Sequence, residues 1–313
     1  MKRSTLALLF AALWLSPLGA QRGSQTTHAP AIDALPIQVM LDRSHFSPGE
    51  IDGNFGMNTD KAIVALAAAR GVTVNLGDRA SLAAALGATG DPLTVYTITT
   101  QDAAGPFTER IPRDLMQQSE LPALNYRSVL EAISEKFHSS PALLQRLNPG
   151  AGFGEGQEIR VPNVAGGDEA AAATPAGDVT VTVSKHDSSL AVRDGAGRVL
   201  MYAPVTSGSE HDPLPIGTWS VTGVQRNPAF NYNPDLFWDA NPEHSKAKIP
   251  PGPNGPVGVV WIGLNKEHYG IHGSPEPNLI GRTTSHGCVR LTNWDALRLA
   301  ALVKKGTAVV FQE

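Results

Sequence analysis

The sequence predicts a multidomain chain: a small α-helical module, a mixed α+β module, and a mostly β C-terminal domain with a sandwich-like or barrel-like sheet. Its 313 residues exceed what one small domain needs and favour two or three domains. Its 31 Gly and 24 Pro favour many turns and short strands over a helical bundle. Residues 165–178, rich in Ala, Gly, Thr and Pro, are typical of a linker between two halves of the chain.

Residues 1–20 have the features of a secretory signal peptide. Lys2 and Arg3 form a basic start, an apolar run extends from Leu6 to Leu15, and small residues lead to Ala20. The run is too short to span a bilayer, which takes roughly 20 apolar residues. The alternative to a signal peptide is a buried helix at the N-terminus. We therefore expect export to the periplasm and no transmembrane segment in the mature chain.

Residues 31–90 predict the helical module. Apolar residues recur near helical spacing on both sides of a turn that runs from Pro48 to Thr59. Glycines supply the backbone freedom of this turn, and Asn58 or Thr59 is expected to cap the second helix. The Asp-Gly-Asn cluster in the turn lacks the spacing and the terminal Glu of a calcium loop, so we expect no calcium site.

Residues 93–164 predict the α+β module, in which two helices lie between two strands. The first strand alternates in polarity, and the second helix ends at Asn148-Pro149-Gly150. Residues 101–125 form an insertion after the first strand. The expected strands are residues 93–99 and 157–161, and the expected helices are residues 128–137 and 141–147.

Residues 179–313 predict the mostly β domain, because short alternating segments are separated by turns that contain Gly and Pro. One helix interrupts the strands: Thr292 and Asp295 form a capping box before a helical run at residues 296–304. The expected strands are residues 179–183, 190–193, 199–205, 218–224, 259–264, 269–272 and 308–311.

Cys288 is the only cysteine of the chain, and an unpaired thiol in an exported protein indicates a reactive or intermolecular group. A nucleophilic thiol needs a proton acceptor and nearby positive charge. His272, His286 and Arg290 supply both within one short stretch. Gly287 lets the backbone approach a substrate, and the amides around Cys288 are candidates for an oxyanion hole.

Three other interpretations compete with a cysteine nucleophile. Cys288 and His286 could simply be packed in a turn, because a free Cys behaves as a small hydrophobe. His268, His272, His286 and Cys288 could bind zinc, but their spacing fits no standard zinc pattern, so we expect no metal. A serine nucleophile is disfavoured because the chain has no Gly-x-Ser-x-Gly elbow. The formal net charge of −4 gives no footprint for nucleic acid.

The two N-terminal modules resemble peptidoglycan-binding families. The turn Ile51-Asp52-Gly53-Asn54-Phe55-Gly56 followed by Thr59 resembles the signature of peptidoglycan-binding domain 1, over residues 32–70. Residues 143–149 and 156–162 resemble parts of LysM, a glycan-binding module, although the compact module lacks the 101–125 insertion.

The C-terminal domain resembles the L,D-transpeptidase catalytic (YkuD) domain, in its periplasmic Gram-negative branch, over about residues 179–313. The resemblance is carried by His272-Gly273, by the block from Ser285 to Arg290, and by the turn from Pro215 to Thr218. It implies a mostly β fold and a cysteine acyl transfer on the tetrapeptide stems of peptidoglycan. D-Ala is released, and the acyl group forms a cross-link or is attached to a lipoprotein.

The resemblance also implies roles for individual residues. Cys288 becomes the nucleophile, His272 the general base, and Gly273 the residue whose backbone orients His272. His286 and Gly287 match the block that shapes the oxyanion site, and Ser285 supports that block. Arg290 stands where some branches have Asn, and our hypothesis is that it contacts a substrate carboxylate. Tyr269 and Trp261 are candidate walls of the cleft, with ordinary strand aromatics as the alternative.

The expected partners are peptidoglycan and, as one acyl acceptor, an outer-membrane lipoprotein; no cofactor is expected. The sequence leaves the acceptor open, because acylation uses the same residues with any acceptor. Water as acceptor would make the chain an L,D-carboxypeptidase or amidase. A non-catalytic peptidoglycan-binding protein is the remaining alternative, and the intact pair of His272 and Cys288 argues against it.

Overall fold

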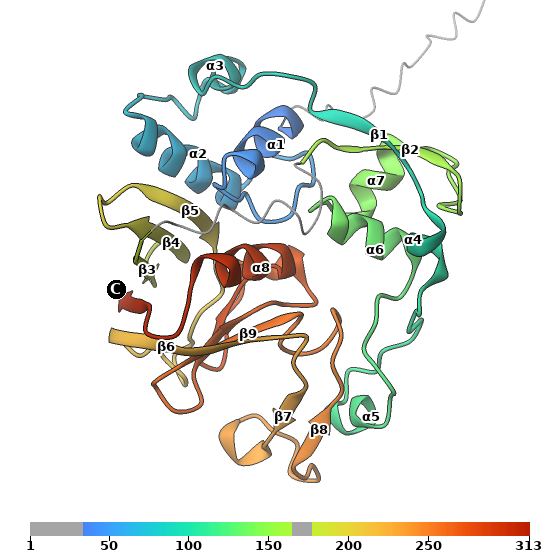
Figure 1. The fold of residues 1–313 in the computed structure, drawn as a ribbon, viewed down its shortest axis with the longest axis vertical. Helices are drawn as coiled ribbons and strands as arrows, with labels where there is room; N and C mark the ends of the chain where they lie inside the picture. Colours follow the sequence, from blue (N-terminus) through green and yellow to red (C-terminus); the bar gives the residue numbers. More distant parts are fainter. Residues whose placement is uncertain (1–33, 165–176) are drawn as a thin grey trace, which may run out of the picture. The chain divides into compact units, whose positions relative to one another are not determined.

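The computed structural model describes residues 34–164 and 177–313 of the chain (Figure 1). The expected signal peptide and most of the expected linker lie outside the described residues. Everything described falls within one unit, Ile32–Glu313. In the part of the chain that the structure describes, no helix is long and apolar enough to cross a membrane.

Three helices occupy the region of the expected helical module. They pack through buried apolar residues such as Leu41, Ile63 and Leu82. The prediction that Asn58 or Thr59 caps the second helix is wrong, because that helix begins at Met57. Asn58 instead donates to the carbonyl of Ile280, and Thr59 is buried and accepts a hydrogen bond from a glutamine of the first helix. The helices are α1 (Leu35–Arg43), α2 (Met57–Arg70) and α3 (Arg79–Ala85).

The next region has two paired strands at its ends and helices between them. Its first and last strands pair antiparallel, with Leu93 opposite Pro162. Ser128 and Ser140 cap the two helices that the sequence predicted here, by accepting hydrogen bonds from backbone amides of the first turn. The elements are β1 (Leu93–Thr97), α4 (Thr100–Ala104), α5 (Leu115–Ser119), α6 (Val129–Lys136), α7 (Pro141–Leu147) and β2 (Glu158–Pro162).

An eight-stranded sheet dominates the C-terminal half, in the order β11-β10-β9-β6-β12-β3-β4-β5. The two end strands approach each other, because Thr206, just after β5, exchanges backbone hydrogen bonds of 3.1 and 2.8 Å with Arg290 in β11. The sheet is therefore curled, and the predicted mostly β fold is confirmed in its barrel-like form. The strands are β3 (Val179–Ser184), β4 (Ser189–Asp194), β5 (Val199–Pro204), β6 (Gly217–Arg226), β9 (Val260–Leu264), β10 (Gly270–His272), β11 (Val289–Arg290) and β12 (Ala308–Gln312).

Helix α8 (Asn293–Leu302) packs on this sheet and completes its core (Figure 1). Leu299 on the helix shares one buried cluster with Ile262 and Ile271 on the strands. Thr292 caps the helix as predicted, since its side chain accepts a hydrogen bond from the Asp295 amide. Because the helix starts directly after this cap and stops at Leu302, the predicted run at 296–304 was shifted towards the C-terminus.

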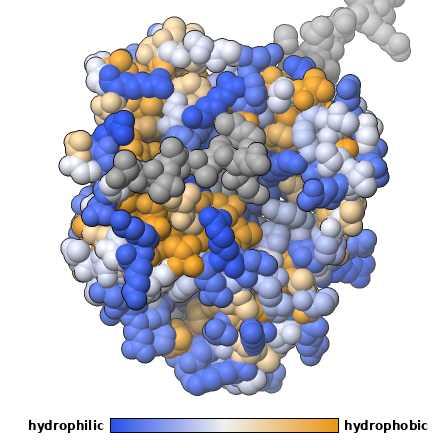
Figure 2. Space-filling view, in the orientation of Figure 1, coloured by the Kyte–Doolittle hydropathy of each residue, from blue (hydrophilic) through white to orange (hydrophobic). Residues whose placement is uncertain are grey.

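A separate pair of strands, β7 (Phe230–Tyr232) and β8 (Ala247–Ile249), was not predicted from the sequence. Each strand has three residues, and the segment between them is rich in Asn, Pro and charged residues, so no alternating pattern marks it. The pair forms its own two-stranded sheet next to α5 (Figure 1). Figure 2 shows mainly hydrophilic residues over the lower part of the visible face, with hydrophobic residues gathered nearer its middle.

Candidate active site

The pairing of β10 with β11 relates the positions of the two principal predicted residues, Cys288 and His272. The strands run parallel, with Ile271 beside Val289 and His272 beside Arg290. Cys288 directly precedes β11, and continuing the register by one residue places it beside Gly270, whose backbone amide contacts its thiol. Neighbouring residues of paired strands point to the same face of a sheet. Cys288 and His272 consequently share one face, displaced by two residues along the strand direction.

His272 is held in one orientation and one tautomer. Its ring is buried, and its Nδ1 lies 2.7 Å from the carbonyl oxygen of Gly273. A carbonyl only accepts hydrogen bonds, so Nδ1 carries the proton of the neutral ring and Nε2 keeps its lone pair. Burial, followed by the positive charge of Arg290, lowers the pKa of His272 to about 4, although the hydrogen bond to Gly273 acts in the opposite direction. At neutral pH the ring is uncharged and Nε2 can accept a proton.

Trp261 stacks on His272, and a glycine makes room for it. The ring centroids lie 5.5 Å apart with an angle of 21° between the planes. Trp261 is opposite His272 in the β9–β10 pair, and its indole extends along the strand over Gly270. A Cβ at Gly270 would lie 2.5 Å from Cζ2 of Trp261, which is too close for any side chain there. The stack therefore depends on glycine at position 270.

The turn before Cys288 is fixed by a glycine and a serine. Gly287 has φ +97°, and a Cβ there would lie 2.7 Å from the ring of Tyr269. Ser285 is buried, and its Oγ donates a 2.6 Å hydrogen bond to the carbonyl of Cys288. Tyr269 thus lies against the turn that carries Cys288, and its role as a wall of a cleft stays a prediction.

Cys288 is a protonated thiol in this environment. Its Sγ lies 3.7 Å from the carbonyl oxygen of His268. Burial raises the pKa of the Cys288 thiol, against the opposing effects of a backbone hydrogen bond from Gly270 and the charge of Arg290. A neutral thiol therefore shares its face of the sheet with a neutral imidazole.

Arg290 brings an unsatisfied donor close to this pair. Its Nε is buried and has no hydrogen-bond partner among the described residues. The positive charge of Arg290 lowers the pKa of both His272 and Cys288, and burial lowers the pKa of Arg290 itself, against the opposing effects of Cys288 and Glu276. A buried N–H without a partner costs free energy, so this position favours a group that accepts a hydrogen bond.

His286 is oriented by residues that the sequence analysis missed. Its Nε2 lies 2.9 Å from Oδ1 of Asp239, and its ring meets Phe237 edge to face at 5.1 Å. Trp238 is close by, with ring centroids 6.3 Å apart, and stacks on His211 at 4.2 Å. Asp239 is 47 residues from His286 in the chain and lies in the segment between β7 and β8, so no motif spacing could link the two.

The zinc alternative has no support in the described part of the chain. Within residues 34–164 and 177–313, no group of three or more His, Cys, Asp or Glu side chains is placed to hold a metal ion. His268 is exposed and lies 3.4 Å from its neighbour Glu267, and His286 faces Asp239.

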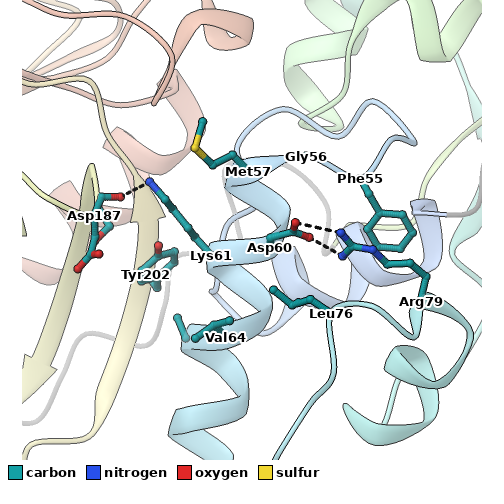
Figure 3. Close-up of a pocket in the computed structure, with 12 residues that line it drawn as sticks. Phe55, Gly56, Met57, Asp60, Lys61, Val64, Leu76, Arg79, Asp187 and Tyr202 are labelled. Carbon is teal, nitrogen blue, oxygen red and sulfur yellow. Dashed lines mark hydrogen bonds and ion pairs between the residues drawn. The ribbon is translucent and has the colours of Figure 1, made fainter.

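A cavity of about 570 Å³ lies away from the cysteine, between α2 and strands β4 and β5 (Figure 3). Met57 and Val64 line it from the helix side and Tyr202 from the sheet side. Lys61 reaches across it and donates to the carbonyl of Asp187 at 2.6 Å. None of the predicted site residues lines this cavity, so its walls hold neither a thiol nor a histidine.

Comparisons with known proteins point to one family. A family model described as the L,D-transpeptidase catalytic domain matches residues 155–311, just over half of the chain. The chain is 30% identical to L,D-transpeptidase YkuD of Bacillus licheniformis over 183 residues, which cover 58% of this chain and 91% of that protein. It is also 30% identical to the Bacillus subtilis protein of the same name over 182 residues, with the same shares. Among solved structures, an L,D-transpeptidase from Mycobacterium smegmatis aligns with a TM-score of 0.36 and 18% identity, over 50% of this chain and 64% of that chain.

Proposed function

The chain belongs to the L,D-transpeptidase family, and we propose that Cys288 carries out its acyl transfer with His272 as the general base. As a family member the chain is an L,D-transpeptidase, a cysteine acyltransferase that acts on peptidoglycan. Two observations support the residue assignment: His272 pairs with Arg290, two residues after Cys288, and Nδ1 of His272 is bound to the Gly273 carbonyl, which leaves Nε2 to accept a proton.

Acylation starts from the neutral pair. His272 takes the thiol proton through Nε2 while Sγ of Cys288 attacks the carbonyl of the third stem residue. The tetrahedral intermediate collapses, the C–N bond to the terminal D-Ala breaks, and His272 returns the proton to the leaving amine. The product of this half-reaction is a thioester on Cys288 and free D-Ala.

Deacylation uses the same two residues in reverse. An acceptor amine loses a proton to Nε2 of His272 as it attacks the thioester, and the proton then returns to Sγ of Cys288. The low pKa of His272 keeps its ring unprotonated at the start of both half-reactions.

The turn from Ser285 to Cys288 is the proposed oxyanion site. Its backbone amides would stabilise the developing negative charge on the attacked oxygen. The hydrogen bond from Ser285 to the Cys288 carbonyl and the glycine conformation at 287 support a preorganised turn. His286 belongs to the same turn, and its bond to Asp239 restricts the orientation of its ring.

Arg290 is the proposed contact for a substrate carboxylate. Its buried Nε without a partner supports this role, because a carboxylate would satisfy it with a charge-assisted hydrogen bond. Arg290→Lys should then raise KM more than it lowers kcat. An unchanged KM would remove Arg290 from the substrate site.

We also propose which regions of the chain bind the cell wall, which region is catalytic, and where the protein acts. We assign residues 31–90 and 93–164 as peptidoglycan-binding-1-like and LysM-like modules that hold the wall, residues 165–178 as the linker, and residues 179–313 as the catalytic domain of the Gram-negative branch. The signal-peptide features of residues 1–20 support action in the periplasm.

The test is product analysis with a disaccharide-tetrapeptide, using wild type, Cys288→Ala and His272→Gln. We expect D-Ala release that depends on both residues, together with a cross-linked dimer. A tripeptide as the sole product would identify water as the acceptor, and acyl transfer to an added lipoprotein peptide would identify wall attachment. D-Ala release by Cys288→Ala at the wild-type rate would exclude the proposed nucleophile.

A further inference from the structure

We propose that residues 105–127, here called the arm, complete the active site from the N-terminal half of the chain. The arm holds residues 230–249, here called the hairpin, against His286 and so positions the turn that carries Cys288. The arm includes most of the insertion at residues 101–125, to which the sequence assigned no role. This inference rests on the proposed function of Cys288.

The hairpin needs an outside support. It contains β7 and β8, which pair only with each other and are not part of the eight-stranded sheet. An isolated two-stranded hairpin is marginally stable at best in water. Within the described chain, the buried cluster of the hairpin joins Tyr232 and Ile249 to Leu124 of the arm, and the residues packed around this cluster also come from the hairpin and the arm alone.

A polar link reinforces this apolar contact. Oδ2 of Asp114 lies 3.0 Å from Nε2 of His244, and Nδ1 of the same ring lies 3.0 Å from the hydroxyl of Tyr232. A carboxylate accepts, so Nε2 donates to Asp114, while Nδ1 is hydrogen-bonded to the tyrosine hydroxyl. Both nitrogens of this largely buried ring are therefore engaged, one by the arm and one by β7.

The arm also fixes the loop that follows the hairpin. Leu124 donates its amide to the carbonyl of Pro251 and accepts from the amide of Asn254, both at 3.0 Å. Gly252, with φ +149°, passes so close that a Cβ would lie 2.1 Å from the Leu124 carbonyl oxygen. Asn254 is buried and donates to the carbonyl of Asn125 at 2.9 Å. The Pro-rich stretch at residues 249–256 is thus held against the arm through Pro251, Gly252 and Asn254.

From the hairpin, contacts lead directly to the catalytic turn. Tyr232 packs on Phe237 with ring centroids 5.6 Å apart, and Phe237 meets His286 at 5.1 Å. Asp239 holds the same histidine with a 2.9 Å contact. His286 precedes Cys288 by two residues, so a displaced hairpin would release the turn in which the thiol and the proposed oxyanion amides lie. Small displacements of reacting groups lower kcat strongly.

The test compares two equal truncations in buried cores. Leu124→Ala removes a fully buried side chain from the contact between arm and hairpin, and Leu82→Ala removes an equally buried one from the helical region, away from the hairpin. We expect both variants to lower the denaturation midpoint, but only Leu124→Ala to lower kcat for D-Ala release, by about ten-fold or more, with a small change in KM. Equal kcat values in the two variants would overturn the inference.

A second pair of variants, with smaller structural changes, tests the inference if Leu124→Ala does not fold. Asp114→Ala breaks the link to His244, whereas Glu109→Ala changes an exposed arm residue that has no hydrogen bond or ion pair with the part of the chain that the structure describes. We expect Asp114→Ala, and not Glu109→Ala, to lower kcat and to speed amide hydrogen exchange in residues 230–249 and 284–288. The kcat losses of Asp114→Ala and Asp239→Ala should be less than additive in the double variant, because both act through His286. Wild-type kcat and exchange in Asp114→Ala would refute the role of the arm, while wild-type protein without Cys288-dependent turnover would refute the proposed function itself.

Discussion

A buried ion pair joins the N-terminal half to the catalytic half, and replacing Arg298 by Met tests its contribution. Arg298 on α8 donates to both oxygens of Asp42 on α1, at 3.0 and 2.7 Å. Asp42 is 0% exposed and Arg298 is 7% exposed. His138 adds a 3.0 Å contact to the same carboxylate. The two halves of the chain are therefore connected through a charged group that water does not reach.

The expected cost of Arg298→Met follows from this burial. Burial alone would raise the pKa of Asp42, but Arg298 and His138 outweigh it and hold that pKa well below its usual range. Without Arg298 the carboxylate remains buried and loses its main countercharge. Breaking a buried pair in this way costs about 3–5 kcal/mol, a large part of the stability of an ordinary domain.

The assay is chemical denaturation at pH 7 followed by far-UV circular dichroism. We expect Arg298→Met to lose about 3–5 kcal/mol, and Asp42→Asn combined with Arg298→Met to recover a substantial part of it, because the double variant has no unpaired charge at position 42. A loss below about 1 kcal/mol, the range of exposed ion pairs, would contradict a dry contact between the two halves.

Three further outcomes follow from the geometry of the site. The pKa of His272 is lowered from 6.5 to about 4, so the unfolded chain binds this proton more tightly, and about 3 kcal/mol of stability present at neutral pH is lost as the pH falls from 6.5 through 4. Relative to His272→Gln, wild type should therefore become less stable over this window in denaturation curves, and a constant difference would count against the neutral buried ring. Because burial raises the pKa of Cys288, its alkylation by iodoacetamide should still be accelerating above pH 9, and a rate already constant by pH 7 would indicate a thiolate–imidazolium pair instead. Gly270→Ala should lower kcat by about ten-fold or more, since the new Cβ displaces Trp261 from His272, whereas wild-type kcat would show that the stack is dispensable.

The sequence predicted those features that depend on the chemistry or the local pattern of residues near one another in the chain. An unpaired thiol preceded by histidines led to the prediction of Cys288 and His272 as site residues, and the capping box at Thr292 located helix α8 to within a few residues. The alternating strands predicted most of the curled sheet. Each of these features depends on residues close together in the chain.

The parts that the sequence did not predict depend on distant contacts. Strand β11 has two residues, and the position of Cys288 relative to His272 follows only from the pairing of this strand with β10. The bond from Asp239 to His286 spans 47 residues, and the contacts of Leu124 with Pro251 and Asn254 span more than twice that distance. No periodicity in the sequence predicts such pairs. The sequence therefore assigned no role to the insertion at residues 101–125, because its contacts lie far away in the chain.

The assignment of Cys288 as the acylated nucleophile is tested most directly by intact-protein mass spectrometry. Wild type and Cys288→Ala are mixed with a disaccharide-tetrapeptide, quenched in acid within the first turnover, digested and mapped. We expect a mass increase equal to the stem without its terminal D-Ala, on the peptide that contains Cys288, and no adduct in the variant. An adduct on another residue, or D-Ala release by the variant at the wild-type rate, would contradict the assignment.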